Sequence, residues 1–295
     1  MSELKERVQP KIEMTYKMDR HQWLEHRRKG IGGSDVSAIL GFNSWRSPFE
    51  VWADKTGRLP IDDSGNEFTH WGNIMEPILA KEFQQQTGKK VHRQNKTFVD
   101  PEYDFLRADI DRDIVGEEGF LEIKTAMEFK SSEWTDDEIP PAYLLQVQHY
   151  MMVLDRPYCY FATLIGGHRF ITKRVDRDDE LIATMRQQLV DWWQKHIIQD
   201  VPPEVDGTDS TTNTLKQLHH KTEGQPIILN DDLDKLLVER EHLKEGLKTY
   251  TDDIKTTENK VREAMLTTEV GTSNHFVVTN RLTKRGNRVL RIKEK

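Results

Sequence analysis

The sequence is almost free of cysteine and has no long apolar run. Cys159 is the single cysteine among 295 residues, which excludes a disulfide within the chain and a multi-cysteine metal or iron–sulfur site. No apolar stretch approaches the roughly 20 residues that a bilayer span requires, and the N-terminus has no apolar signal core. We also find no internal repeats and no low-complexity segments. These absences predict a cytoplasmic protein with no membrane partner.

Charged residues are abundant but unevenly distributed along the chain. The 43 Lys and Arg residues are outnumbered by 50 Asp and Glu residues, which gives a net charge of −7. If this charge were spread evenly, it would oppose a nucleic-acid partner. The stretch 272–295 instead carries seven Lys and Arg residues against the single acidic residue Glu294. Such a basic strip suits contact with phosphates, so the overall charge does not exclude a DNA enzyme.

Apolar periodicity predicts an α/β (α+β) fold for the first two thirds of the chain. Helical spacing and stop signals indicate helices over 19–30, 34–41, 48–56, 69–88, 140–155 and 178–200, and short extended segments lie between them. We expect Ser34 to cap the second helix. The fourth should face the core through Trp71, Ile74, Ile78, Leu79 and Phe83. This order predicts a mixed central sheet flanked by helices.

The C-terminal third has a different character. Residues 201–214 are rich in Pro, Gly, Ser and Thr and are expected to form a linker, so we divide the chain into domains 1–207 and 208–295. Apolar residues every three or four positions from 230 to 266 predict a long helix or a helical hairpin. Apolar and polar residues alternate on both sides of the turn 284–287, which predicts a basic β-hairpin over 273–295. We expect 230–295 to extend a DNA-binding surface or a subunit interface.

The strongest chemical signal is Asp111 followed by Glu122 and Lys124 on two predicted strands joined by a turn. Because side chains alternate along a strand, Glu122 and Lys124 share one face, and Asp111 can face them from the partner strand. Two carboxylates directed at one point form an oxygen site suited to Mg²⁺ or Mn²⁺. A lysine beside such an ion would orient or help deprotonate the attacking water and offset the charge of a phosphoryl transition state.

The same three residues also fit a solvent-facing set of cross-strand charges, which has little energetic value. Three helical residues favour the catalytic interpretation, because Glu76, Gln146 and Tyr150 could line the same cleft. Gln146 and Tyr150 share a helical face at a spacing of four. The histidine beside them, His149, is expected to be structural.

Four segments together resemble the YqaJ-like viral recombinase family, to which the phage lambda exonuclease is related. They are WLEHRRKGIGGSDVSAILG, GNIMEP, ADIDRDIVGEEGFLEIKTA and YLLQVQHYMMVL, and the similarity covers about residues 20–200. The resemblance implies a PD-(D/E)XK restriction-endonuclease-like core and a Mg²⁺-dependent 5′ to 3′ exonuclease for double-stranded DNA, with Mn²⁺ able to substitute and two ions expected. It also implies a phage or prophage origin in a bacterial host, a ring-shaped homotrimer and a single-strand annealing protein as partner in recombination.

The resemblance assigns roles to individual residues. Asp111, Glu122, Glu76 and the carbonyl of Ile123 correspond to metal ligands, and Lys124 to the catalytic lysine. Gln146 begins the family's QxxxY motif, which Tyr150 completes. An arginine and a serine that hold a DNA 5′-phosphate correspond to Arg27 and Ser34. Their alternative interpretation is an exposed basic cluster and a helix cap. The chain departs from the family's Ser-Pro-Asp by reading Asp109-Ile110-Asp111, which leaves a metal role for Asp109 open. Whether Gln148 takes part in the site is open as well.

Two other functions remain open at this point. One is a PD-(D/E)XK endonuclease of the restriction or repair type, which would use the same core but cut internally. The other is a non-catalytic DNA-binding module with a vestigial acidic site. A 5′-phosphate pocket would argue against the first, and a metal titration would test the second.

Overall fold

A computed structural model describes residues 9–135, 138–221, 224 and 226–295. The chain divides into two compact units, residues 1–222 and residues 223–295. Within the described ranges, no helix combines the length and the apolar content needed to cross a bilayer.

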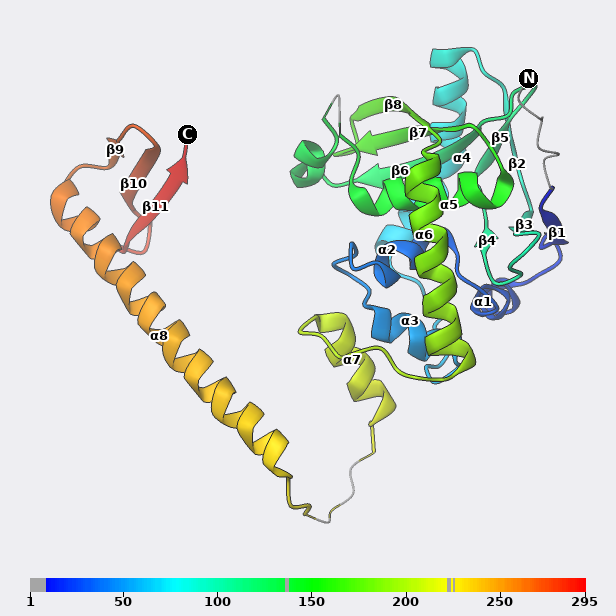
Figure 1. Cartoon of the computed structure of the whole chain (residues 1–295). Coiled ribbons are helices and arrows are strands. Elements are labelled where there is room, and N and C mark those ends of the chain that lie inside the picture. Colours follow the sequence, from blue (N-terminus) through cyan, green and yellow to red (C-terminus); the bar gives the residue numbers. More distant parts are fainter. Residues whose placement is uncertain (1–8, 136–137, 222–223, 225) are drawn as a thin grey trace. The chain divides into compact units, whose positions relative to one another are not determined.

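The first unit is built around a five-stranded mixed sheet (Figure 1). Its strand order is β2-β5-β6-β7-β8, with β6 and β7 parallel and the other neighbours antiparallel. Strands β6 and β7 can run parallel because α5 lies between them in the chain and serves as the crossover connection. The bounds are β2 Val91–Arg93, β5 Arg112–Ile114, β6 Phe120–Ala126, β7 Tyr158–Ile165, β8 Arg169–Asp176 and α5 Pro141–Leu154.

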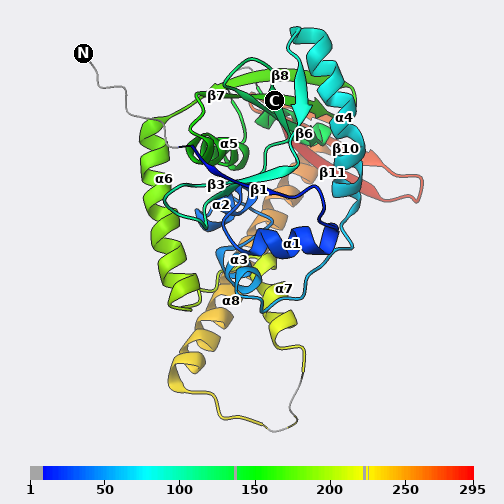
Figure 2. The ribbon, with the colours of Figure 1, turned by 90° about the vertical axis from the view of Figure 1, so that its right-hand side faces the viewer.

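Helices cover both faces of this sheet, as Figure 2 shows with α4 on one side of the strands and α5 on the other. Alternation along β6 divides its side chains between the two faces. Leu121 packs with Phe83 of α4 in a small apolar cluster, whereas Phe120 belongs to the main core together with residues of α5. Helix α4 spans Glu67–Thr87. The predicted mixed sheet flanked by helices is confirmed, and β6 carries the Glu122-Ile123-Lys124 part of the predicted motif.

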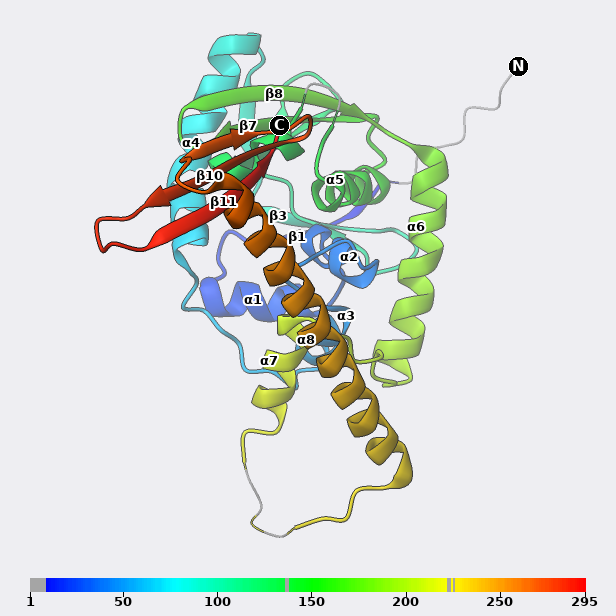
Figure 3. The same cartoon turned by 90° about the vertical axis from the view of Figure 1, so that its left-hand side faces the viewer.

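Shorter elements complete the unit beside α5. A second antiparallel sheet has the order β1-β3-β4, and α2 packs closely on α5 while α6 packs along it (Figure 3). The last turn of α6 continues as a π-helix. The bounds are β1 Lys11–Met14, β3 Lys96–Val99, β4 Arg107–Ala108, α1 Arg20–Arg28, α2 Gly33–Ile39, α3 Pro48–Lys55, α6 Asp179–Trp192, the 3₁₀ helix Glu128–Glu133 and the π-helix Trp193–Ile198.

Two details of the predicted helices are wrong. Helix α2 starts at Gly33 with Gly32 as its N-cap, so Ser34 lies inside the first turn and is not the cap. Helix α4 buries only its C-terminal part through Leu79, Ala80 and Phe83. Its N-terminal apolar residues are exposed, because no element of the described chain covers that half; they are Trp71, Ile74 and Ile78.

The predicted linker contains a helix, α7, over Asp209–Leu218. It docks on α3 through hydroxyl groups: the Ser47 amide donates to the Ser210 hydroxyl at 2.9 Å, and the Thr211 hydroxyl donates to that of Ser47 at 2.9 Å. Because these contacts are polar, apolar periodicity does not reveal them. They join α7 to the first unit, so the structure divides the chain near residue 222 instead of after residue 207.

The second unit consists of one long helix and a small sheet (Figure 1). Helix α8 runs without interruption over Asp231–Met265, which settles the choice between a helix and a helical hairpin. The predicted basic hairpin is confirmed as β10 Phe276–Leu282 and β11 Arg288–Glu294. A third strand, β9 Val270–Thr272, pairs with β10.

Candidate active site

One cleft of the first unit collects the predicted site residues. It has a volume of about 840 Å³ and opens between α1, α4, α5 and the ends of β5 and β6. All eight predicted side chains line it, although they come from segments spread over more than a hundred residues. These are Arg27, Ser34, Glu76, Asp111, Glu122, Lys124, Gln146 and Tyr150.

Asp111 lies in a bend directly before β5 and reaches across to β6. Its Oδ2 atom accepts a hydrogen bond of 2.7 Å from the backbone amide of Ile123. Because β5 and β6 pair antiparallel from Arg112 and Leu121 onward, this side-chain bond continues the ladder by one step. The Asp111 carboxylate is therefore held beside Glu122.

Glu122 and Lys124 project from the same face of β6 toward α5, as the strand period requires. The Lys124 ammonium donates to Glu122 Oε1 at 2.7 Å and to Gln146 Oε1 at 3.0 Å. Gln146 Nε2 donates to the same Glu122 oxygen at 2.6 Å, and Gln146 lies 3.3 Å from the Tyr150 hydroxyl. The Lys124 ammonium also lies 5.0 Å from the centre of the Tyr143 ring. Gln146 thus joins the carboxylate and the lysine into one network.

Gly33 allows α2 to approach this network. A Cβ atom at this position would lie 2.6 Å from Gln146 Cγ and 2.6 Å from Tyr150 Cε1, well inside van der Waals contact. The first turn of α2, which carries Ser34, can therefore lie directly against the face of α5 that supports Lys124.

The charges of the cleft perturb its titrating groups. Burial and the neighbouring charge of Glu122 raise the pKa of Asp111 to about 8. Burial alone would lower the pKa of Lys124, but the charges of Glu122 and Asp111 outweigh it and raise that pKa. Lys124 is therefore a cation at neutral pH, whereas Asp111 without a bound cation is mostly protonated there, which relieves its repulsion with Glu122.

Two observations fit a cation between these carboxylates. The Oε2 atom of Glu122 is buried and has no hydrogen-bond partner among the described residues, and such an atom is costly unless something binds it. The raised pKa of Asp111 likewise shows that a positive charge is needed to keep both groups ionised. The site is nevertheless sparse: in the described ranges no three His, Cys, Asp or Glu side chains gather closely enough to hold a metal ion by themselves.

Glu76 and Asp109 lie in the cleft with other partners. Glu76 forms an ion pair with the buried Arg112. Asp109 accepts a hydrogen bond of 2.6 Å from the Thr97 hydroxyl. Ligation by either residue would need its side chain to exchange or share that partner, so their metal roles stay predictions.

Arg27 and Ser34 meet in the same cleft. The Arg27 Nη2 group donates to the Ser34 hydroxyl at 2.8 Å, and its guanidinium lies 4.8 Å from the centre of the Trp23 ring. Both partners are neutral, and within the described part of the chain no carboxylate forms an ion pair with Arg27. A guanidinium in this state suits an incoming phosphate.

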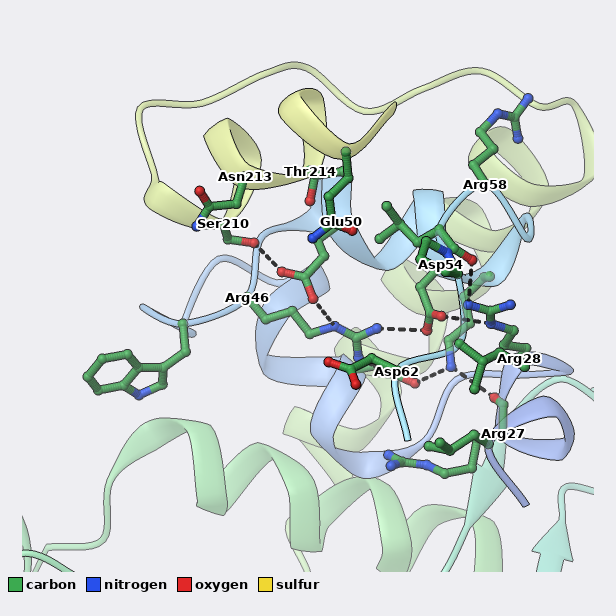
Figure 4. A pocket seen from close by; sticks show the side chains of 18 of the residues that line it. Arg27, Arg28, Arg46, Glu50, Asp54, Arg58, Asp62, Ser210, Asn213 and Thr214 are labelled. Atoms are coloured by element: carbon green, nitrogen blue, oxygen red, sulfur yellow. Dashed lines mark hydrogen bonds and ion pairs between the residues drawn. The ribbon is translucent and has the colours of Figure 1, made fainter. Parts of the chain in front are cut away.

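A buried charge network lies behind Arg27 (Figure 4). Asp35 Oδ2 accepts from the Lys55 ammonium at 2.7 Å and from the Gly32 amide at 2.9 Å. Lys55 also donates to the Arg27 carbonyl at 2.9 Å. Burial would raise the pKa of Asp35, but the charges of Lys55 and Arg46 hold it well below its ordinary value. Lys55 and Asp35 thereby tie the end of α1 to the start of α2.

The other residues of α5 that were left open have structural roles. The Gln148 side chain bonds the Asp176 carbonyl at 2.9 Å and the Asp178 amide at 3.0 Å, which ties α5 to the start of α6. His149 is fully buried and bonds the Arg107 carbonyl at 2.9 Å. Burial lowers the pKa of His149, so it is neutral and unsuited to acid–base work.

Sequence reasoning missed the residues that support the site. The Asp35, Arg46 and Lys55 network has no local signature, because each residue is an ordinary charged residue of a short helix or loop. The cleft also has basic residues of its own, which are Arg20, Arg93 and Lys96. They are scattered in the sequence, whereas the C-terminal basic strip is contiguous and easily seen.

Comparisons with known proteins agree on one family. Residues 22–157 match the family described as the YqaJ-like viral recombinase domain. An uncharacterized protein, YqaJ, of Bacillus subtilis (strain 168) is 40% identical over 279 residues, which are 90% of this chain and 86% of that protein.

Two solved structures are also similar in part. An alkaline exonuclease, LHK-Exo, from Laribacter hongkongensis is 17% identical with a TM-score of 0.48, over 60% of this chain and 92% of that one. A phage related exonuclease from Haemophilus somnus 129PT is 16% identical with a TM-score of 0.43, over 58% of this chain and 96% of that one.

Proposed function

Because the chain belongs to the YqaJ-like viral recombinase family, we propose that it is a metal-dependent exonuclease that digests double-stranded DNA from 5′-phosphorylated ends in the 5′ to 3′ direction. One observation carries the proposal: a single cleft is lined both by Asp111, Glu122 and Lys124 and by the Arg27–Ser34 pair. A nuclease that cuts internally has no need for a phosphate-binding pair beside its catalytic centre.

The carboxylates and the lysine have distinct tasks in this proposal. Asp111, Glu122 and the Ile123 carbonyl would hold Mg²⁺ or Mn²⁺, with Glu76 as a further candidate ligand; the metal would polarise the scissile phosphate and activate water. Lys124 is a cation, so it would orient the attacking water and offset the charge that develops on the phosphoryl group. Gln146, which Tyr150 contacts, holds Lys124 in position.

The 5′ end is recognised by charge and by shape. Arg27 would bind the terminal phosphate with its planar fork, and the Ser34 hydroxyl would add a hydrogen bond at the start of α2, where the helix dipole favours an anion. The Trp23 ring, whose centre lies 4.8 Å from the guanidinium, would help to hold it in place through a cation–π contact. In keeping with the family, we propose that the protein works as a homotrimer and with a single-strand annealing protein in recombination.

The test is digestion of a linear duplex labelled at one end, beside a covalently closed circle of the same sequence, with Mg²⁺ and with EDTA. We expect mononucleotides from the linear duplex only, with Mg²⁺ only, and faster digestion when the 5′ end is phosphorylated. Efficient cutting of the circle would favour the endonuclease alternative. Duplex binding without any product over a range of Mg²⁺ and Mn²⁺ concentrations would favour the non-catalytic alternative.

A further inference from the structure

Helix α8 presents an apolar stripe that no element of its own unit covers. Six large apolar side chains of this stripe are exposed, with fractions from 45% for Leu233 to 71% for Tyr250. The stripe ends at Met265, which is buried against the small sheet near Gly271. A helix that leaves such a stripe open in water needs a partner.

The spacing of the stripe identifies the kind of partner. Its residues follow a heptad of alternating three- and four-residue steps over the whole 35-residue helix, which is the pattern of a coiled coil. One set of core positions holds Leu233, Arg240, Leu247, Ile254 and Val261. The other set holds Leu236, Leu243, Tyr250, Thr257 and Ala264.

A parallel pair of these helices would be unfavourable. Each core layer would then contain the same residue from both chains, so Arg240 would face Arg240 of the second copy inside the apolar seam. The flanking positions would also place Asp253 beside Glu258 of the second copy. Both contacts bring like charges together.

An antiparallel pair removes both conflicts. With the two helices in full overlap, Leu247 packs against Tyr250 of the second copy, Leu243 against Ile254, and Leu236 against Val261. Arg240 then faces the neutral Thr257. Glu239 lies beside Lys260 of the second copy, once toward each end of the pair.

We therefore infer that α8 is a self-association site that pairs antiparallel with α8 of a second copy of this chain. The sequence of α8 is complementary to itself in this register, in apolar layers and in charge, which is what a two-fold contact requires. In the homotrimer proposed above, on which this step rests, the contact would join copies from two separate trimers, because a two-fold pair cannot close a ring of three.

The first test measures the mass of the full chain by sedimentation or light scattering. The Leu247→Glu variant should have half the mass of the wild type, because it places a charge in the central layer. Leu247 is 67% exposed within the chain, so this substitution removes little packing from the folded protein. Thr249→Glu adds the same charge on the opposite face of α8 and should keep the full mass.

The second test exchanges the flanking charges. Glu239→Lys and Lys260→Glu should each weaken self-association by about tenfold, since each converts two attractive pairs per dimer into repulsive ones. The double variant Glu239→Lys/Lys260→Glu should restore the wild-type association, because the exchanged charges again meet in the antiparallel register. In a parallel pair Glu239 faces Lys244, so the double variant would not recover.

Three outcomes would overturn the inference. They are equal mass for the wild type and Leu247→Glu, loss of mass in Thr249→Glu as well, and no recovery in the double variant. The first of these would indicate that α8 docks on its own chain or on a different protein. Every experiment here measures self-association through mass, so its outcome does not depend on whether the protein is a nuclease.

Discussion

The contact between Arg27 and Ser34 makes a quantitative prediction about DNA ends. Replacing Arg27 with Ala should slow digestion of a 5′-phosphorylated duplex by about ten- to a hundredfold. A charge-assisted hydrogen bond contributes about 1.5–3 kcal/mol, and each 1.4 kcal/mol corresponds to a factor of ten. The same substitution should slow digestion of a 5′-hydroxyl duplex only slightly, because that end has no terminal phosphate for Arg27 to bind.

The folded protein should tolerate this change. Arg27 contacts the neutral Ser34 hydroxyl and the Trp23 ring, so its removal leaves no carboxylate without its direct ion-pair partner. Arg27→Lys keeps the charge but loses the planar fork, and its loss of rate should be intermediate. Unfolding in urea should show little change in stability for either variant.

The assay compares initial rates on two duplexes that differ only in the 5′ end. Arg20→Ala is the matched control, because Arg20 lines the same cleft and lies 5.3 Å from the centre of the same Trp23 ring, whereas the hydrogen bond to Ser34 comes from Arg27. Arg20→Ala should slow digestion of both duplexes equally, because Arg20 would contact only the DNA backbone. If Arg27→Ala also slows both equally, Arg27 binds the DNA backbone and the end-recognition argument is refuted.

Three further predictions concern the catalytic network and the packing behind it. Lys124→Ala should lower the cleavage rate by about a hundredfold or more while duplex binding measured by anisotropy survives, because the lysine acts on the transition state; near-normal cleavage would contradict its role. The lowered pKa of Asp35 means that its ionised form stabilises the fold above about pH 4 and that this contribution fades as the pH falls further. Asp35→Asn should therefore be less stable at pH 7, by about 3–5 kcal/mol for a broken buried pair, and its urea midpoint should depend less on pH below 4 than that of the wild type. Gly33→Ala should lower the free energy of unfolding by about 1–3 kcal/mol, because the added methyl group overpacks against Gln146 and Tyr150, and it should slow cleavage. An unchanged free energy of unfolding and an unchanged cleavage rate would show that α2 can move away from α5 freely.

Much of the fold and of the metal-proximal site follows from local sequence patterns. The two-residue period of β6 is enough to place Glu122 and Lys124 on one face, and the turn between β5 and β6 brings Asp111 beside them. The heptad of α8 and the alternation of β10 and β11 likewise predict helical structure over 230–266 and a hairpin, although the structure was needed to show that α8 is one unbroken helix. These features depend on neighbouring residues, so the sequence alone determines them.

Tertiary structure decided the features that depend on distant segments. The apolar residues of α4 have the same helical spacing throughout, yet only the part that meets β6 is buried, so Phe83 lies in the core and Trp71 lies in solvent. Glu76 pairs with Arg112 because α4 passes that strand. Lys55 reaches both Asp35 and the Arg27 carbonyl because three short helices converge. A polar side chain bonds whichever group the fold brings within about 3 Å, and no local period in the sequence encodes that choice.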